Sequence, residues 1–153
     1  MKLIVAAVGK PRSAALAAAI EHYESRAAKY WPLEVREVRE ESARGSAENV
    51  VRDKEADRLM SRVEGATVIA CDERGTAMTS TIFARFVQDA RERARDVAFI
   101  IGGAYGLADS VRERAQTRLA LATWTLPHEL ARLVLAEQLY RAGTIIRGEP
   151  YHK

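Results

Sequence analysis

Residues 119–142, LALATWTLPHELARLVLAEQLYRA, join an apolar run to a segment with helical periodicity. Leu119 to Leu126 has the character of a buried strand, and the residues after it space their leucines as an amphipathic helix does. Pro127 lies at the junction, where it disfavours a helical conformation of the preceding residue and fits the first turn of a helix. The stretch therefore predicts a strand that gives way to a helix at Pro127. Free backbone groups are expected there, at the edge where open α/β sheets bind ligands.

Polar side chains follow this junction at helical spacing. His128 and Arg132 are four residues apart and share a helix face, and Glu137 and Arg141 repeat the spacing further along. These four residues are candidates for a functional site. The alternative is an ordinary core strand followed by an amphipathic helix whose charges face solvent, and spacing alone leaves both interpretations open.

The composition is that of a globular protein with one core. The 153 residues predict a single domain over 1–153, with 48% hydrophobic and 29% charged residues. No apolar run is long enough to span a bilayer and the N-terminus lacks a signal-peptide pattern, so we expect a cytoplasmic protein without membrane contact. The single cysteine, Cys71, excludes an internal disulfide and a multi-cysteine zinc site.

The net charge of +3 says little about partners. The excess lies in the second half of the chain, and nineteen of the 24 basic residues are arginine, whose guanidinium suits bidentate phosphate contacts. This composition permits an RNA partner without requiring one. The three histidines lack the partner spacing of a metal site, and no Gly-x-Ser-x-Gly motif indicates a hydrolase, so we expect no metal.

Strand-like and helix-like segments alternate five times along the chain. Strands are predicted at Lys2–Gly9, Leu33–Arg39, Ala66–Asp72, Val97–Ile101 and Leu119–Leu126. Helices are predicted at Ser13–Lys29, Ala47–Val63, Thr79–Arg95, Ser110–Arg118 and from Pro127 onward. This alternation predicts an α/β fold with a mostly parallel sheet flanked by helices.

The strand segments differ in their expected places in the sheet. Val97–Ile101 is a continuous β-branched run and is expected at the centre, whereas Leu33–Arg39 alternates apolar and charged residues and is expected near an edge. Glu73–Gly75 is expected to form a turn that closes the third strand. Thr144–Ile146 is expected to be a short apolar piece that follows the last helix.

The helical segments carry predictions about caps and buried faces. Residues 110–113 (SVRE) fit a capping box that opens a helix. The second helix is expected to bury Val50 and Leu59 and to expose its charged segment DKEADR, residues 53–58, to which we assign no chemistry. The third helix is expected to bury Ile82 among its apolar residues.

Two further strand ends carry residues that suit a ligand site. Asp72 ends a predicted strand, although an aspartate before a glycine turn usually accepts hydrogen bonds from local backbone amides. Gly102 to Gly106 follows the VAFII run, and side-chain-free backbone there lets a flat ligand approach closely. The spacing matches neither the dinucleotide fingerprint nor a phosphate-binding loop, and a glycine turn without a ligand is the alternative.

The last seven residues, RGEPYHK, place an aromatic ring, an imidazole and a cation side by side. Chain ends usually fray. The apolar Thr144–Ile146 segment just before them would pin the tail to the body of the protein, and a pinned tail can complete a site.

Three ordered motifs now identify a family. IIGGAYGL at 100–107, TLPHELARLVLAEQLYRA at 125–142 and PYHK at 150–153, together with the opening KLIVAAVGK, resemble the RlmH family over the full length of the chain. These are the ribosomal RNA large-subunit methyltransferases of the SPOUT superfamily. The resemblance implies methyl transfer from S-adenosylmethionine to N3 of a pseudouridine in 23S rRNA, within the assembled ribosome. It also implies a homodimer and an α/β fold with a C-terminal trefoil knot.

The resemblance implies a cofactor pocket that holds adenine and ribose mainly by backbone groups of three strand-end loops. Carried over by position, the cofactor-binding residues are Cys71, Asp72, Gly102, Gly103, Ala122, Thr123, Trp124, Thr125, Leu126 and Pro127. Family members commonly carry an aliphatic residue where this chain has Cys71, and often a basic one at Thr76. A backbone-mediated contact should survive the first departure.

The reaction requires that N3 of pseudouridine lose its proton before it attacks the methyl carbon. The resemblance makes His152 the preferred base, with His128 or Glu137 as alternatives, because a pKa near neutrality suits the task. Tyr151 is a candidate for stacking on the target base.

The resemblance assigns RNA binding to Arg132, Arg141 and Lys153, and both arginines are also suited to a developing oxyanion. In the family the tail and knot of two subunits come together, so the tail is expected to complete a neighbour's site. Two alternatives stay open: a non-catalytic ribosome-associated factor, and another nucleotide-binding α/β protein such as a flavin binder.

Overall fold

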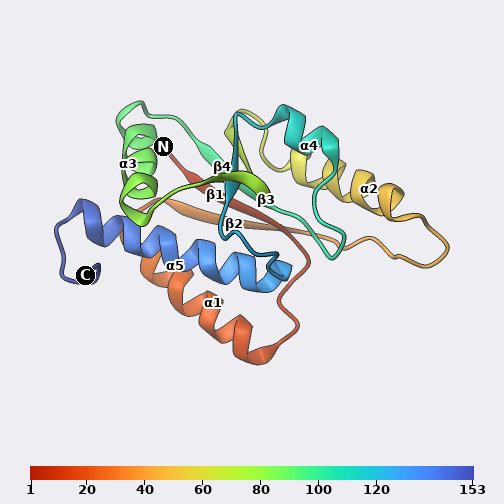
Figure 1. Ribbon diagram of the computed structural model, residues 1–153, viewed down its shortest axis with the longest axis horizontal. Coiled ribbons are helices and arrows are strands. Elements are labelled where there is room, and N and C mark those ends of the chain that lie inside the picture. The colour runs from red at the N-terminus through yellow and green to blue at the C-terminus, as the bar shows by residue number, and fades with distance from the viewer.

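Five parallel strands form one sheet in the computed structural model, which describes residues 1–153 (Figure 1). The strands are β1 (Leu3–Val8), β2 (Leu33–Val38), β3 (Thr67–Ala77), β4 (Val97–Ile101) and β5 (Thr117–Ala120). The helices are α1 (Ala14–Ala27), α2 (Glu48–Ser61), α3 (Ser80–Glu92), α4 (Asp109–Arg114) and α5 (His128–Ile146). The predicted α/β class, with a parallel sheet flanked by helices, is therefore confirmed.

The strand order β2-β1-β4-β3-β5 places the most apolar strand in the middle of the sheet. Every residue of β4 is buried, as the VAFII run predicts, and β2 forms an edge, as its alternating pattern predicts. β5 forms the other edge. Because all paired strands are parallel, the carboxyl ends of β3, β4 and β5 meet on one side of the sheet.

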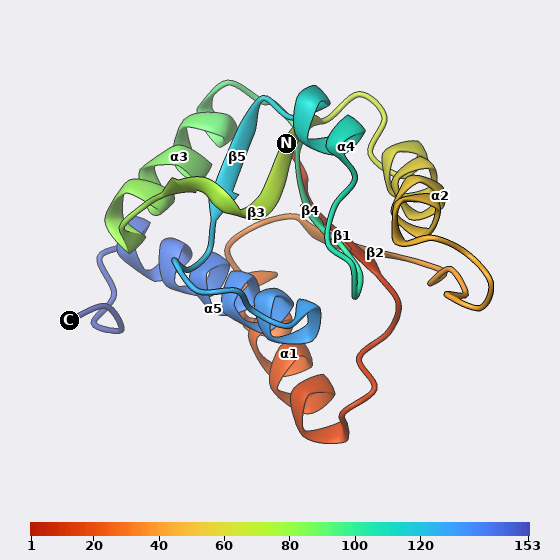
Figure 2. The ribbon, with the colours of Figure 1, turned by 45° about the vertical axis from the view of Figure 1, so that its right-hand side comes forward.

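Helices cover both faces of the sheet (Figure 2). α1, α3 and α5 pack together on one face, and α2 and α4 lie on the other. Two apolar clusters fill the layers between the helices and the sheet, with Phe99 in one and Ile100 in the other. Successive residues of β4 thus serve opposite faces, as the alternation of side chains along a strand requires. None of the helices combines the length and apolar character that a membrane crossing needs.

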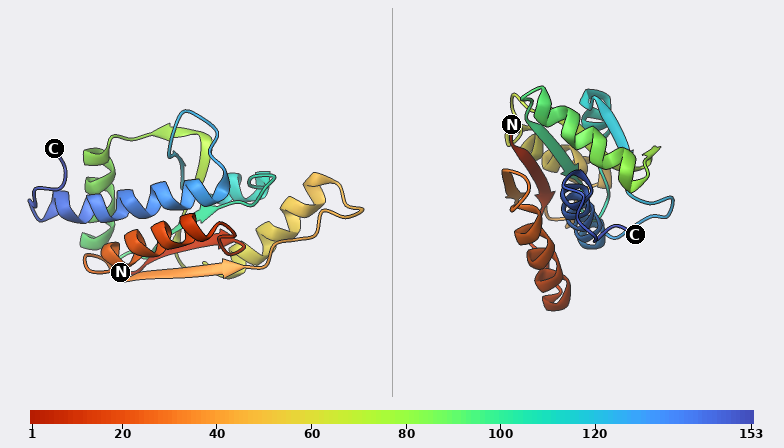
Figure 3. Two further views of the ribbon diagram at one scale, coloured as in Figure 1. Left: turned by 90° about the horizontal axis from the view of Figure 1, so that it is seen from below. Right: turned by 90° about the vertical axis from the view of Figure 1, so that its left-hand side faces the viewer.

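α5 lies alongside α1 in close contact (Figure 3). The fully buried Trp31 donates its indole Nε1–H to the Leu139 carbonyl oxygen over 2.8 Å and anchors the middle of α5. Further along, Gly143 sits directly against the ring of Tyr30 and leaves no room for a Cβ atom. These contacts fix both the direction and the depth of α5.

The boundaries around the last strand differ from the prediction. β5 begins at Thr117 and ends at Ala120, so residues 121–127 are loop rather than strand. α4 ends at Arg114, and Ala108 precedes it without a side-chain cap, so the predicted capping box does not form. Pairing with β3 explains the shift, because the ladder runs from Ile69 opposite Thr117 to Ala77 opposite Ala120 and recruits residues that were predicted to be helical.

Two other predicted breaks are absent. β3 continues through residues 73–75 to Ala77, with an irregularity between Cys71 and Thr76, instead of turning after Asp72. A Cβ at Gly75 would lie 2.5 Å from the backbone of Arg118, so glycine is what allows β5 to approach here. Residues 144–146 form the last turn of α5 rather than a separate piece.

Two helices turn a different face to the core from the predicted one. In α2, Val51, Glu55 and Leu59 are buried, whereas Val50 is exposed, so part of the DKEADR segment faces inward. In α3, Ile82 is 57% exposed. Both helices contain apolar residues at adjacent positions, and the periodicity cannot choose between neighbours until the docking of the helix fixes its rotation.

Gly143→Ala tests the close packing of α5 on Tyr30. In an ordinary helix interior this change stabilises by about 1 kcal/mol. Here the added methyl group overlaps a packed ring, so we expect the free energy of unfolding to fall by about 1–3 kcal/mol. Urea denaturation measures the change. In a Tyr30→Ala background the same substitution should be neutral or stabilising, and a stabilised single variant would contradict the packing.

Candidate functional site

A cavity of about 1070 Å³ opens at one edge of the sheet, where residues 71–74 of β3 meet the segments that follow β4 and β5. Its size is at the upper end of the range for small-molecule pockets. Except for Thr123, all the predicted cofactor-binding residues line it: Cys71, Asp72, Gly102, Gly103, Ala122, Trp124, Thr125, Leu126 and Pro127. His128 lines it as well. Three segments distant in sequence therefore form one pocket.

The turn at residues 102–106 forms one wall and requires glycine for steric reasons. A Cβ at Gly102 would lie 2.6 Å from the backbone carbon and oxygen of Gly106, and one at Gly103 would lie 2.8 Å from Glu55 Oε2. Gly106 has a φ of +78°, which favours glycine. Gly103 pairs with Gly106 across the turn, whereas the backbone N–H groups of Gly102, Ala104 and Tyr105 donate no hydrogen bond within the chain. The turn thus offers free donors beside the cavity.

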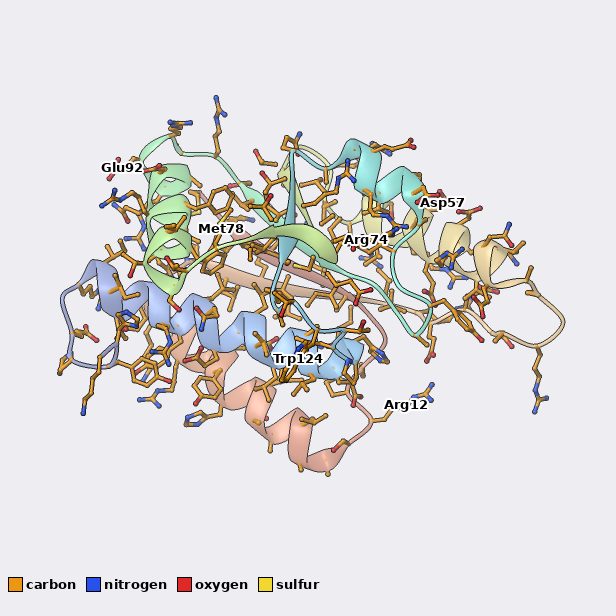
Figure 4. The ribbon with its side chains drawn as sticks, viewed as in Figure 1. Arg12, Asp57, Arg74, Met78, Glu92 and Trp124 are labelled. Carbon is orange, nitrogen blue, oxygen red and sulfur yellow. The ribbon has the colours of Figure 1, made fainter.

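The loop at residues 121–126 forms another wall of the cavity and also has free backbone N–H groups. None of its backbone N–H groups donates a hydrogen bond within the chain, because β5 ends at Ala120 and leaves the segment without a ladder partner. Pro127 then starts α5 without a side-chain cap. Trp124, at the mouth of the pocket, is 81% exposed (Figure 4). Such walls suit a ligand recognised through backbone groups.

The carboxylate of Asp72 is occupied by the protein itself. Its Oδ1 accepts the Arg74 backbone N–H over 2.9 Å, and its Oδ2 lies 3.3 Å from Arg112 Nε. Burial opposes its ionisation, but the Arg74 N–H and the two guanidinium groups outweigh that effect and lower the pKa of Asp72. The alternative of a local backbone hydrogen bond is therefore the one observed. Beside it, burial raises the pKa of the Cys71 thiol to about 12, which keeps it neutral.

A second group of polar residues gathers at the other end of α5. We call Glu137, Arg141, Tyr151 and His152 the tail cluster. Glu137 Oε1 accepts hydrogen bonds from Arg141 Nε over 2.9 Å and from the Tyr151 hydroxyl over 3.0 Å. The Arg141 guanidinium lies 4.7 Å from the centre of the Tyr151 ring, and its Nη1 is 3.3 Å from His152 Nδ1. The tail is pinned to α5 by these contacts.

Burial and ring contacts hold Tyr151 in this cluster. Its ring centre lies 4.6 Å from that of Tyr140. Burial, with hydrogen bonds to Tyr23 and Glu137, raises the pKa of Tyr151, so the phenol keeps its proton. The Glu137 carboxylate raises the pKa of Arg141 in turn. His152 and Lys153 are exposed beyond these contacts.

The pocket lies at the start of α5, whereas the tail cluster lies along the second half of the helix, toward the C-terminus (Figure 1). His128 and Arg141 are thirteen positions apart, which corresponds to roughly 20 Å along a helix. In one chain, the predicted bases Glu137 and His152 therefore stand apart from the cavity that His128 lines. A single copy brings together the predicted cofactor-binding residues but not the tail.

Arg132 lies away from both groups. It is only 6% exposed, its Nε donates to Glu24 Oε1 over 2.8 Å, and its Nη1 lies 3.7 Å from Glu37 Oε2. The guanidinium thus joins α1, β2 and α5 inside the protein. Its predicted contact with RNA or with an oxyanion is not supported by this position, because a buried and paired cation is not available to a ligand.

Several residues of the pocket were not predicted. Glu48 and Arg52 come from α2, and Asp109 and Arg112 come from α4. No sequence motif or residue spacing could have indicated these four residues, because only the topology of the sheet brings the starts of α2 and α4 to the cavity. The histidine, cysteine, aspartate and glutamate side chains form no group of three that could hold a metal ion.

The fold is shared with known methyltransferases. A probable methylase family protein from Haemophilus influenzae Rd KW20 superposes with a TM-score of 0.57 at 15% identity, over 99% of this chain and 70% of that one. A tRNA (m1G37) methyltransferase from Aquifex aeolicus gives 0.54 at 12% identity, over 92% and 70%. A family model described as "Predicted SPOUT methyltransferase" matches residues 1–152. The class defined by the fold and the site is that of the SPOUT methyltransferases.

Sequence relatives define the family more narrowly. Two proteins named "Ribosomal RNA large subunit methyltransferase H" match this chain over the full length of both sequences. The one from Gemmatimonas aurantiaca is 60% identical and the one from Anaeromyxobacter sp. (strain Fw109-5) is 50% identical. One from Geobacter metallireducens is 44% identical over 99% of each chain. The chain belongs to the RlmH family of SPOUT methyltransferases, which confirms the resemblance found in its motifs.

Asp72→Asn tests the charge pairing at the pocket. The pKa of Asp72 is lower in the folded state, so its carboxylate stabilises the protein above the ordinary carboxyl pKa of about 4. That contribution is lost as the pH falls through the lower folded-state pKa. We expect Asp72→Asn to be less stable than wild type at pH 7, with a difference that shrinks below about pH 4.

Urea titrations across this pH range measure the difference. The matched control is Glu73→Gln, which removes an exposed carboxylate at the next position and should change stability little at either pH. A stability deficit of Asp72→Asn that stays constant with pH would contradict the role of its charge.

Proposed function

We propose that the protein transfers a methyl group from S-adenosylmethionine to N3 of a pseudouridine in 23S rRNA of the large subunit, within cytoplasmic ribosomes. The carrying observation is the pocket of unpaired backbone groups at the start of α5, in a chain 60% identical to a ribosomal RNA large subunit methyltransferase H. The name of this relative supports large-subunit rRNA as the substrate, and the pocket offers a binding site for the methyl donor.

The pocket fits the methyl donor through its two walls. An adenine ring and a ribose present several hydrogen-bonding groups, and the turn at 102–105 and the loop at 121–126 both offer free backbone N–H groups. The glycines allow the ligand to approach the backbone closely. When bound, S-adenosylmethionine supplies an electrophilic methyl group on a sulfonium centre. The main contribution of the protein is then alignment, which saves on the order of 7 kcal/mol or more in well-oriented reactions.

Removal of the N3 proton falls to a side chain of the protein. We keep His152 as the proposed base, because its imidazole is exposed and held by Arg141 at a fixed place in the tail cluster. His128 lines the pocket of its own chain and is the alternative. Glu137 accepts hydrogen bonds from Arg141, Gln138 and Tyr151, so its role is to hold the tail rather than to take the proton.

The separation along α5 supports a homodimer with composite sites. A rigid helix of roughly 20 Å keeps each tail away from its own pocket. Leu130, Leu133 and Val134 leave an apolar side of α5 half-buried, and Trp124 is exposed at the pocket mouth. A second copy packed there would cover apolar surface and bring its tail cluster to this pocket. Arg141 and Lys153 would then meet the RNA beside the target base, with Tyr151 next to it.

Cofactor binding is the first test. Wild-type protein should bind S-adenosylmethionine in a calorimeter, and Gly102→Ala should weaken binding about tenfold or more because the added Cβ displaces the Gly106 backbone. Gly65→Ala is the control. Gly65 has a φ of +81° and open space around it, so the alanine variant strains the backbone away from the pocket and should bind the cofactor as wild type does.

Absence of binding by the folded wild type would refute the methyltransferase proposal. Mass spectrometry of 23S rRNA from a deletion strain completes the test. A fully modified pseudouridine in that strain would instead favour a non-catalytic ribosome-associated factor.

Mixed dimers test whether the tail acts on the neighbouring pocket. One subunit carries Gly102→Ala and the other carries His152→Ala, and differently tagged chains are purified as the heterodimer. If the tail acts in trans, one site has both an intact pocket and an intact tail, so about half of wild-type activity is expected. If it acts in cis, both sites are impaired.

The reciprocal heterodimer is the control. It pairs a wild-type subunit with one that carries both substitutions, and it should be nearly inactive if the tail acts in trans. Homodimers of His152→Ala should bind the cofactor within a few fold of wild type and lose methyl transfer. Unchanged turnover of that homodimer would remove His152 from the mechanism.

A further inference from the structure

Glu55 of α2 is a buried carboxyl group with only half of its hydrogen bonds made. The residue is 3% exposed, and its Oε1 accepts the Glu41 backbone N–H over 3.1 Å. Its Oε2 has no hydrogen-bond partner and no contact with solvent. A buried polar atom without a partner is costly, and in a native structure it calls for an explanation.

The unpartnered oxygen stands directly behind the glycine turn of the pocket. A Cβ built on Gly103 would lie 2.8 Å from Glu55 Oε2 and 3.1 Å from Val8 Cγ1. Gly103 therefore fits only because it lacks a side chain, and the carboxyl group of Glu55 occupies the space behind it.

The turn is a thin partition between two cavities. On one side lies the pocket of about 1070 Å³, and on the other lies a smaller one of about 380 Å³ that Glu55 lines. Ala104 and Tyr105 border both. With space on either side, the position of the turn depends on what stands behind it.

Glu55 itself is held by its surroundings. Its carboxyl group is tied to the segment after β2 through the Glu41 N–H, and Glu41 is in turn paired with Arg58 and with Lys54, the latter over 3.5 Å. Burial, with Glu40 and Glu41 nearby, raises the pKa of Glu55 despite the Glu41 N–H and Arg58. Glutamine has nearly the same shape as this side chain and retains an oxygen that can accept the Glu41 N–H.

We propose that Glu55 is a positioning residue of the cofactor pocket: its carboxyl group braces Gly103 from behind and keeps the free N–H groups of the turn directed at the ligand. The inference rests on the proposed cofactor site and extends it to a residue on the opposite side of the turn. Glu55 touches neither the cavity of about 1070 Å³ nor the reacting groups.

Three substitutions at Glu55 separate bracing from other roles. Glu55→Asp withdraws the carboxyl group by one methylene, and Glu55→Ala removes it, so both leave a gap behind Gly103. We expect each to weaken binding of S-adenosylhomocysteine about tenfold or more by calorimetry. Glu55→Gln keeps the shape of the side chain and should bind S-adenosylhomocysteine within about threefold of wild type. The KM for the methyl donor should rise only in Glu55→Asp and Glu55→Ala.

Leu59→Ala is the matched control. Leu59 is buried one turn along the same face of α2, so this variant loses core packing without touching the turn. It should lower the melting temperature yet bind the cofactor product within about twofold of wild type. Equal loss of affinity in Leu59→Ala, or a glutamine variant as weak as the alanine one, would overturn the bracing role.

Hydrogen–deuterium exchange gives a readout without any ligand. Amides of residues 102–106 should exchange faster in Glu55→Asp than in wild type, and should be unchanged in Leu59→Ala. Faster exchange in a protein that fails to bind S-adenosylmethionine would uphold the bracing and refute the proposed function. Unchanged exchange in Glu55→Asp would refute the bracing alone.

Discussion

The loss of ladder partners after β5 is the constraint on which the site depends. Parallel strands carry their following segments to the same edge of the sheet, and β5 stops after four residues at Ala120. The six residues that follow keep their N–H groups free until α5 begins. A buried loop of this kind would be costly, so it lies at a cavity where solvent or a ligand satisfies its polar groups.

α5 then sets the geometry of everything C-terminal to the pocket. The Trp31 hydrogen bond and the close approach of Gly143 to Tyr30 hold the helix in one orientation on α1. The tail cluster at its far end is fixed by Glu137 and Tyr140 instead of fraying. The pocket lies at the start of this rigid helix and the tail cluster lies along its second half, and this separation is the physical basis for the proposed composite site.

The ionisable side chains inside this protein have different roles. Arg132 is neutralised by Glu24 and Glu37 and joins three elements of the core, where loss of one partner would leave an uncompensated charge. Asp72 is held ionised by two arginines at the pocket wall. Glu55 has no cation against its free oxygen and instead abuts Gly103. The role of each side chain follows from its place in the fold: Arg132 lies in the core, Asp72 lies at the pocket wall and Glu55 lies behind the glycine turn.

The sequence by itself determined the layer architecture, the central strand and one edge strand, the three segments that line the pocket and, through its motifs, the family. These features depend on local apolar periodicity and on contiguous residues that a linear pattern preserves. Only the tertiary structure decided where β5 begins and ends, which face of α2 is buried and where Arg132 finds its partners. Only it showed that His152 lies far from the pocket of its own chain. Strand pairing, helix rotation and the length of α5 are long-range relations, and no local pattern of residues encodes them.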